Sequence, residues 1–264
     1  MFEFFKSIIT KRTLIVELAK RDMSSAYTGS VFGNAWLIID PLISVLVTLV
    51  FFQFTMKNTT TSDIPFVAWV LPQIILWTFI SATMNSSVNM IREYGYLNRH
   101  KSFDMRLLGL IKIYASTYIH IFLILGVIIV LYLVFDLNIK YNIFGVIYYF
   151  ICVSTLLLGI SWIVSTLGVF WKDTRHIVSI FLQLDFWISP IFWEPERFPK
   201  AIAFVMYANP FYYPIHGYRA SILGEPFGPH FFISTLYFWS LVIIFMSIGS
   251  LLFKRLSPSF GDVI

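Results

Sequence analysis

Long apolar stretches separated by short polar segments run through almost the whole chain. Six of them approach the roughly 20 residues that a helix needs to cross a hydrocarbon layer about 30 Å thick. The six spans are expected at about residues 36–56, 66–90, 113–135, 143–170, 177–193 and 231–253. Because no long polar region is left over, the pattern predicts an all-α integral membrane protein with a single transmembrane domain over residues 1–264.

The segment before the first span, about residues 13–30, has one apolar and one polar face. Ile15 and Leu18 follow helical spacing on the apolar face, while Lys20 and Arg21 lie on the other. A helix of this kind lies along the membrane surface. Two interpretations stay open: the helix anchors the first span, or it handles an anionic headgroup or a partner subunit.

The longest polar link between spans follows the second one and reads REYGYLNRHKSFDMRLLGLIK. Its basic residues alternate with Phe103, Leu107 and Leu108. A short helix with an apolar side and basic flanks fits a groove on another protein. The alternative is an ordinary basic loop on the cytoplasmic side.

After the fifth expected span, prolines interrupt the apolar run. Pro190 and Pro195 cannot continue a regular helix. About two turns of apolar helix follow, too short to cross, and Asn209 and Pro210 then turn the chain. Irregular backbone at membrane depth is tolerated only where protein or water surrounds it. The pattern therefore predicts a re-entrant hairpin at about residues 198–222, at the outer mouth of a pathway.

Composition and charge agree with a membrane protein. The 264 residues are 58% hydrophobic and 12% charged, which is too little polar surface for a soluble domain. With the N-terminus in the cytoplasm, the inner segments hold fourteen of the 19 Lys and Arg residues and the outer segments hold five. This bias predicts that both termini are cytoplasmic. Because the basic residues are spread over short loops, the net charge of +5 does not indicate nucleic-acid binding.

The beginning and the cysteine content add two expectations. The N-terminal residues lack the long apolar core and cleavage site of a signal peptide, so we expect them to stay in the mature protein. The single cysteine, Cys152, lies in an apolar run and cannot form a disulfide within the chain.

Motifs for catalysis are missing from the sequence. No GxxxxGK[ST] phosphate loop occurs, so we expect that the chain does not hydrolyse ATP by itself. The five histidines form no HExxH pattern and there is no GxSxG motif, so neither a catalytic metal nor a catalytic serine is expected. Asp185 is the exception to the apolar fifth span. An ionised carboxylate there needs a partner or water, so it either bonds a neighbouring helix or lines the pathway.

Aromatic residues make up 19% of the chain. Many belong to the membrane interface, but those in the second and fifth spans are candidates to line a channel, because aromatic faces pack against the apolar faces of sugars. The candidate channel residues are Trp69, Trp77, Phe79, Phe186, Trp187, Phe192 and Trp193, with Asp185.

Three segments carry a resemblance to a known family: LAKRDMSSAYTGSVFGNAWLIIDPL, VFWKDTRHIVSIFLQLDFWISPIFWEPERFP and NPFYYPIHGYRASIL. They resemble the membrane subunits of type-2 ABC exporters that move lipid-linked cell-envelope polymers, and the likeness runs over nearly the whole chain. The paired SPIFW and NPFYY pattern with the downstream GYR is most similar to wall teichoic acid permeases, while O-antigen and capsular polysaccharide permeases share the layout. Relatives often carry basic residues after the RD pair, where this chain has Ser24, Ser25 and Ala26.

The resemblance implies a bacterial cytoplasmic membrane protein that forms a homodimer around a central channel. Two separate ATPase subunits would bind ATP and Mg²⁺ on the cytoplasmic side, and this chain itself would bind no cofactor. The resemblance assigns substrate access and headgroup contact to Lys20, Arg21 and Tyr27. It assigns ATPase coupling to Asn98, Arg99, His100, Lys101, Ser102, Phe103 and Arg106. It assigns the outer gate to Pro190, Pro195, Asn209, Pro210 and Arg219.

The expected function is that of the permease subunit of an ATP-driven exporter for a polyprenyl-pyrophosphate-linked polymer, with wall teichoic acid first. O-antigen or capsular polysaccharide export is one alternative, and efflux of a small amphipathic drug is another. A third alternative is an integral membrane enzyme that acts on lipid. The absence of a clustered set of His, Asp or Glu residues argues against this last alternative.

Overall fold

A computed structural model describes residues 2–25, 29–55, 64–99, 103–135, 141–226 and 231–263. Within these ranges every regular element is a helix, which confirms the all-α fold class. The α-helices are α1 Phe2–Thr10, α2 Arg12–Ser25, α3 Trp36–Thr55, α4 Phe66–Val88, α5 Met90–Glu93, α6 Leu107–Leu133, α7 Ile143–Phe170, α8 Thr174–Ile188, α9 Lys200–Ala208, α10 Tyr212–Leu223, α11 Phe231–Leu256 and α12 Phe260–Val263. Short 3₁₀ turns are η1 Gly33–Ala35, η2 Gly95–Arg99, η3 Pro195–Arg197 and η4 Ser257–Ser259.

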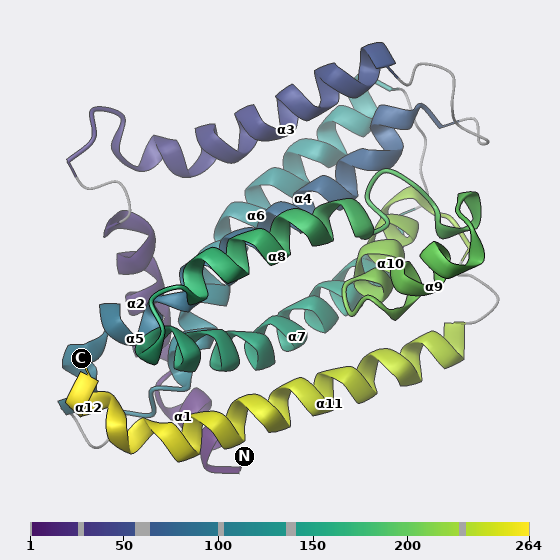
Figure 1. The fold of residues 1–264 in the computed structure, drawn as a ribbon. Coiled ribbons are helices and arrows are strands. Elements are labelled where there is room, and N and C mark those ends of the chain that lie inside the picture. The colour runs from purple at the N-terminus through teal and green to yellow at the C-terminus, as the bar shows by residue number, and fades with distance from the viewer. Residues whose placement is uncertain are drawn as a thin grey trace.

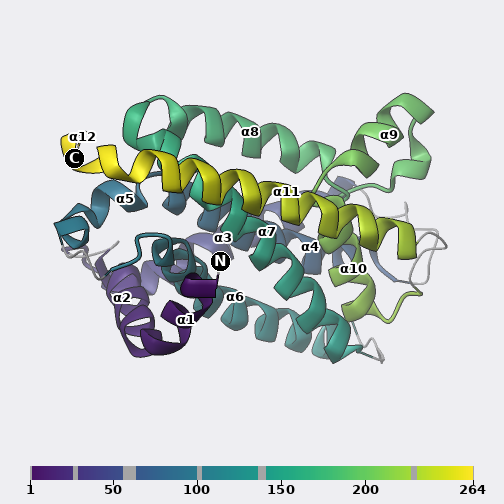
Figure 2. The same ribbon diagram turned by 90° about the horizontal axis from the view of Figure 1, so that it is seen from below.

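The long helices run beside one another between two ends of the molecule (Figures 1 and 2). We call the end that holds α1, α2, α5 and α12 the N-terminal end, and the end that holds α9 and α10 the far end. Both described chain termini lie at the N-terminal end (Figure 1). The segments that do not cross the bundle are thus divided between its two ends.

Five helices of the described chain are long and apolar enough to cross a membrane: α3, α4, α6, α7 and α11. The fifth expected span corresponds to α8, which has 15 residues and a length of about 22 Å. It ends at Ile188 because Ser189 takes an extended conformation and Pro190 cannot continue the helix. The structure therefore supports five full-length spans, and α8 is too short by itself to be a sixth.

The N-terminal segment folds as two helices. The surface helix expected at about residues 13–30 is α2, whose buried residues are Ile15, Leu18 and Ala19. Residues 26–28 lie outside the described residues. The sequence reasoning did not anticipate α1, in which Phe4 is buried edge-on against Trp162 of α7.

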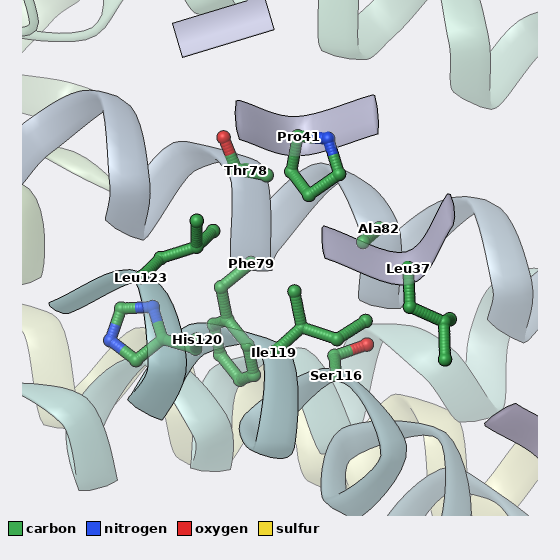
Figure 3. A pocket seen from close by; sticks show the side chains of 9 residues that line it. All are labelled: Leu37, Pro41, Thr78, Phe79, Ala82, Ser116, Ile119, His120 and Leu123. Carbon is green, nitrogen blue, oxygen red and sulfur yellow. The ribbon is translucent and has the colours of Figure 1, made fainter. Parts of the chain in front are cut away.

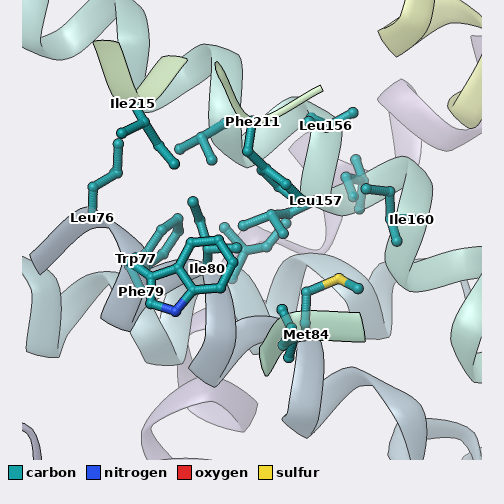
Figure 4. Packing of buried hydrophobic residues seen from close by; sticks show 14 of the residues in the cluster. Leu76, Trp77, Phe79, Ile80, Met84, Leu156, Leu157, Ile160, Phe211 and Ile215 are labelled. Carbon is teal, nitrogen blue, oxygen red and sulfur yellow. The ribbon is translucent and has the colours of Figure 1, made fainter. Parts of the chain in front are cut away.

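Helix α4 is the centre of the bundle and is buried on most of its surface. Figure 4 shows Leu76, Trp77 and Ile80 of α4 packed with Leu156 of α7 and Phe211 at the start of α10. A helix that is apolar all round can be buried on all sides, because it needs no polar face for solvent. The surrounding helices are positioned by this shared core.

Helices α7 and α11 cross at two glycines. A Cβ atom on Gly159 would lie 2.8 Å from the backbone nitrogen of Met246, and one on Gly249 would lie 2.6 Å from the carbonyl oxygen of Gly159. Small residues at such crossings let two backbones approach closely in a membrane, where packing rather than the hydrophobic effect drives association. The crossing fixes α11 against the core.

The far end is built from two short helices joined at Asn209 and Pro210. Helix α10 is buried on almost every residue, whereas α9 buries only Ala203 and Met206. Gly224 ends α10 with a φ of 70°, a conformation that glycine adopts without strain. This turn brings Glu225 against Arg219 of α10.

Candidate functional site

A buried cation holds the N-terminal end together. The side chain of Lys112, in the second turn of α6, is 4% exposed. Its Nζ atom lies 2.6 Å from Oδ1 of Asp22 on α2 and 2.7 Å from Oε2 of Glu93 on α5. A buried ammonium is costly unless carboxylates pair with it, so these contacts hold three separate segments at one point.

Tyr94 completes this cluster. Its hydroxyl donates a hydrogen bond of 2.9 Å to Asp22, and its ring centroid lies 5.5 Å from Nζ of Lys112. Burial, followed by the charge of Asp22, raises the pKa of Tyr94, so the phenol keeps its proton and continues to donate at neutral pH. We call Asp22, Glu93, Tyr94 and Lys112 the lysine cluster.

The segment expected to couple to an ATPase, residues 98–106, follows shortly after Tyr94. Asn98 and Arg99 end the 3₁₀ turn η2, rather than belonging to a short α-helix. His100, Lys101 and Ser102 lie outside the described residues.

The segment rejoins the bundle at Phe103 and Arg106. Nζ of Lys11 lies 5.4 Å from the ring centroid of Phe103. The guanidinium of Arg106 pairs with Asp104 at 2.7 Å and lies 5.4 Å from the ring of Phe4. The later part of the segment therefore contacts α1 and the residue that follows it, while its role in docking stays a prediction.

The expected headgroup residues lie on the outside of α2. Lys20 and Arg21 are exposed, and the guanidinium of Arg21 lies 5.9 Å from the ring centroid of Tyr96. The third residue of this set, Tyr27, lies outside the described residues. The two cations are thus available to a ligand at the N-terminal end.

A cavity of about 150 Å³ lies between α3, α4 and α6 (Figure 3). Its walls are Leu37 and Pro41 of α3, Thr78, Phe79 and Ala82 of α4, and Ser116, Ile119, His120 and Leu123 of α6. The hydroxyl of Thr78 donates to the carbonyl of Ile74, and Nε2 of His120 lies 2.9 Å from the hydroxyl of Tyr218. The cavity therefore presents mainly hydrocarbon, and Phe79 forms one of its walls.

Four of the candidate channel aromatics form one cluster at the far end. Phe186 and Trp187 of α8 contact Phe192, with ring centroids 5.2 and 5.7 Å apart, and Trp193 stacks on Trp187 at 5.9 Å. Phe192 also stacks at 4.5 Å on Phe52 of α3. We call these five residues the aromatic cluster.

The other candidate aromatics lie apart or at the edge of this cluster. Trp77 is buried in the core, 5.7 Å from Phe186, while Phe79 belongs to the cavity and Trp69 to the arginine site described below. Whether any of these rings lines a channel stays a prediction.

Asp185 is bonded to the turn between α9 and α10. Its Oδ1 atom accepts a hydrogen bond of 2.7 Å from Nδ2 of Asn209, which also reaches the hydroxyl of Ser189 at 3.0 Å. The side-chain oxygen of Asn209 accepts from the backbone of Phe211 at 2.8 Å. Asp185 thus has the neighbouring partner that one interpretation of the sequence required, and Asn209 and Pro210 are held against the end of α8.

A second buried cation lies at the far end. Arg219 of α10 is 2% exposed, and its Nε donates to Glu225 at 3.0 Å, while Nη2 is 3.7 Å from Glu194. Its guanidinium lies 4.3 Å from the ring centroid of Trp69. Nη1 is buried and has no hydrogen-bond partner among the described residues. We call Arg219, Glu194, Glu225 and Trp69 the arginine cluster.

The five residues expected to form the outer gate all lie at or near the far end. Pro195 follows Glu194 and is buried in η3, and Pro190 is buried after α8. Asn209 and Pro210 lie in the same connection from α8 to α10, whereas Arg219 lies in α10 itself. Their function as a gate stays a prediction.

Known proteins resemble this chain over almost its full length. Residues 13–223 match the family described as ABC-2 type transporter. The chain belongs to the ABC-2 type transporter family. Two O-antigen export system permease proteins RfbA, from Klebsiella pneumoniae and Myxococcus xanthus, are each 21% identical to it. The alignments cover 95% of both chains in the first case, and 94% of this chain and 96% of the relative in the second.

In this ABC-2 type transporter chain, sequence reasoning missed most of the lysine cluster. Lys112 stands alone in the apolar run LLGLIKIYAS, and a lone cation in such a run is a signal for a buried partner. Nothing in the sequence names that partner, because Asp22 is 90 positions away. Glu225 was missed for a different reason, since it follows a glycine turn and resembles an ordinary loop residue.

Proposed function

We propose that this chain is the membrane-spanning permease subunit of an ATP-driven exporter that moves a lipid-linked cell-envelope polysaccharide across a bacterial cytoplasmic membrane. The observation that carries the proposal is the end-to-end match to O-antigen export permeases from two bacteria. A relationship that covers 95% of both chains extends far beyond any single span.

In the proposed complex, two copies of the chain surround the pathway and two ATPase subunits bind at the N-terminal ends. Helix α8 and the residues up to Trp193 would complete a sixth crossing, and α9 and α10 would be the re-entrant hairpin. Both termini would be cytoplasmic. Support comes from the excess of basic residues in the segments of the N-terminal end.

In this proposal, the coupling segment transmits movement from the ATPase to the membrane helices. An ATPase that binds residues 98–106 would pull on a segment that follows the lysine cluster in the chain. The same segment contacts Lys11 through Phe103 and Phe4 of α1 through Arg106. Packed and ion-paired elements transmit displacement as a unit, because they have few intermediate arrangements. Movement at the ATPase would therefore reach α2 and the spans together.

Lys20 and Arg21 would take part at the start of transport. A pyrophosphate carries negative charge, and exposed ammonium and guanidinium groups form charge-assisted hydrogen bonds to phosphate oxygens. The polyprenyl chain would remain in the membrane while the headgroup passes these cations on α2.

The polymer itself has two leading candidates. The SPIFW and NPFYY motifs favour wall teichoic acid, whereas the relatives named above are O-antigen permeases. The aromatic cluster suits a polymer whose repeat units contain sugar rings, because aromatic faces pack against the apolar faces of sugars.

The test is the ATPase activity of the chain co-purified with its ATPase and reconstituted in lipid. Polyprenyl-pyrophosphate carrying O-polysaccharide, the same carrier with teichoic acid, the bare carrier and a small amphipathic drug form the four arms. Stimulation by a polymer above the bare carrier supports the proposal and identifies the polymer. An active complex that responds only to the drug would overturn it in favour of drug efflux.

The headgroup role is tested by Lys20→Ala combined with Arg21→Ala. We expect polymer export to fall roughly fivefold to thirtyfold, because each of the two exposed charges contributes on the order of 0.5–1 kcal/mol to phosphate binding. Lys254→Ala with Arg255→Ala is the matched control, since this adjacent basic pair ends α11 and is also exposed. Equal export by the two double variants would rule out a specific role for α2.

A further inference from the structure

A groove of about 460 Å³ lies at the far end between α9, α10 and α11. Phe204 and Tyr207 of α9 form one wall, and Ile233 and Tyr237 of α11 form the opposite wall. These helices meet at the right-hand side of Figure 1. The volume is about three times that of an apolar cavity that holds one benzene ring, so on the order of a dozen carbon atoms fit. The groove is thus large enough for part of a long hydrocarbon chain.

Three tyrosine hydroxyls around this groove are already engaged in hydrogen bonds. Tyr207 donates its hydroxyl hydrogen to Glu196, and Tyr237 donates to the carbonyl of Ala208 at 2.8 Å. The hydroxyl of Tyr213 lies 2.8 Å from that of Thr235. Three of the four tyrosines of the groove therefore offer ring surface rather than free hydrogen-bonding groups. A sugar would find few polar partners there, whereas a hydrocarbon chain needs none.

The groove continues an apolar surface along α11. Phe232 and Leu236 are exposed beside it, and the exposed side chains of Ile243 and Leu251 continue along the helix. The opposite side of α11 packs on α7 at the crossing near Gly249. In a membrane protein, an exposed aliphatic side of a spanning helix faces lipid chains. A lipid hydrocarbon chain that lies along α11 can therefore enter the groove without leaving an apolar environment.

A cation stands at the rim. Lys200 is exposed at the first position of α9, one turn before Phe204 and about 6 Å along the helix from it. Lysines and tyrosines are the residues that contact phosphate and headgroups at the bilayer interface. The rim and the interior thus match the two parts of a phospholipid.

We propose that the groove holds one acyl chain of a membrane phospholipid, with the lipid phosphate beside Lys200. The acyl chain fills the space between α9 and α11. Without it, the side chains that form the walls of the groove would lose dispersion contacts. The acyl chain moves into the groove from the hydrocarbon of the bilayer, which is equally apolar. Its transfer therefore brings no hydrophobic gain in free energy. The occupant therefore exchanges with bulk lipid, and it acts as packing material that supports α9 from the side of α11.

The test uses the full-length chain in lipid nanodiscs that contain phosphatidylglycerol with a diazirine in one acyl chain. After irradiation, labelled residues are mapped by peptide mass spectrometry. We expect label on α9, at Phe204 and Tyr207, as well as on the exposed side of α11. Ser234→Trp blocks the groove, and we expect it to lower the label on α9 by about threefold or more, because the bulky ring takes the chain's place.

Ser240→Trp is the matched control, since it makes the same change on the same helix at an exposed position outside the groove. Equal labelling of α9 in the two variants would overturn the proposal. So would a wild-type map in which α9 carries no label, and this result remains decisive if Ser234→Trp fails to assemble. Cross-linking of two copies through Phe204→Cys would show that a second chain covers the groove instead. Displacement of the label by equimolar polyprenyl phosphate, but not by added phosphatidylglycerol, would assign the groove to the carrier lipid.

Discussion

Lys112 at the N-terminal end and Arg219 at the far end are both buried cations with two carboxylates and one aromatic ring, yet they differ in tightness. Lys112 has both carboxylates within 2.7 Å, from Asp22 and Glu93. Arg219 has one partner at 3.0 Å and the other at 3.7 Å, and its Nη1 has no partner among the described residues. The first cation thus has short contacts with both of its carboxylates, whereas the second has one short and one long contact.

This difference indicates that the lysine cluster is a rigid contact and that the arginine cluster can rearrange. A fully paired buried charge is costly to break, because each group would be left without a partner. A guanidinium with an unused donor and one long contact loses less when the segments around it shift. We therefore expect α2, α5 and α6 to move as one body, while the connection around η3 and α10 rearranges more easily.

The largest effect is expected for Lys112→Met. It leaves the carboxylate of Asp22, which is 15% exposed, without its cation, while the half-exposed Glu93 regains water. We expect the free energy of unfolding to fall by about 3 kcal/mol, at the lower end of the range for broken buried pairs. Thermal unfolding in detergent, followed by tryptophan fluorescence, measures the change. Lys172→Met, at an exposed position, is the control and should change little.

Asn209→Ala tests the hydrogen bond that holds the turn between α9 and α10 against Asp185 of α8. Without the carboxamide, the buried carboxylate of Asp185 keeps only a hydrogen bond of 3.3 Å from Ser189. We expect a loss of about 2–3 kcal/mol, because an under-satisfied buried charged group retains its desolvation cost. Adding Asp185→Leu should recover part of the loss, since no carboxylate then remains. A double variant less stable than Asn209→Ala would contradict this account.

Arg219→Met makes the direct comparison with Lys112→Met. Both carboxylates of the arginine cluster reach water, so we expect a smaller loss of about 2 kcal/mol. Arg219→Lys should fall between Arg219→Met and the unchanged chain, because it keeps the charge but not the flat contact with Trp69. The same unfolding measurement applies. A loss for Arg219→Met as large as for Lys112→Met would remove the proposed difference between the two ends.

The smallest effect is expected for Glu93→Gln. The side chain is 48% exposed, so solvent screens its attraction to Lys112, and the loss should stay below about 1 kcal/mol. Asp22→Asn should cost more, because Asp22 is better buried and also accepts from Tyr94. The reverse order would show that Glu93, rather than Asp22, is the main partner of the lysine.

The local sequence pattern was sufficient to predict a helix where the structure of a segment depends on that segment alone. An apolar run in a membrane must satisfy its backbone internally, so the stretch expected at 143–170 is the helix Ile143–Phe170. Pro190 limited α8 in the same local way, although its consequence, a helix too short for a full span, was not drawn from the sequence. Helix α1 was missed because a helix of nine residues is not stable by itself, and the sequence does not show which surface packs on its apolar side.

The candidate sites needed more than pattern. Asp185 was recognised as a charge that requires a partner, and Asn209 as a turn residue, but their hydrogen bond joins segments 24 positions apart. Phe79 and Trp187 had the same rank as candidate channel residues, yet Phe79 is enclosed by α6 and α7 and Trp187 is exposed at the far end. Residue type gives each side chain its chemistry, while helix packing decides what it faces.

The sequence by itself determined that this protein is an all-helical membrane protein, because apolar length and backbone hydrogen bonding leave no other solution in a bilayer. It also identified the places where charge and proline interrupt the apolar runs. Only the tertiary structure decided that Lys112 meets Asp22 and that Arg219 lies on Trp69. The physical reason is that a buried charge requires some partner, whereas the identity of that partner depends on which helices pack together.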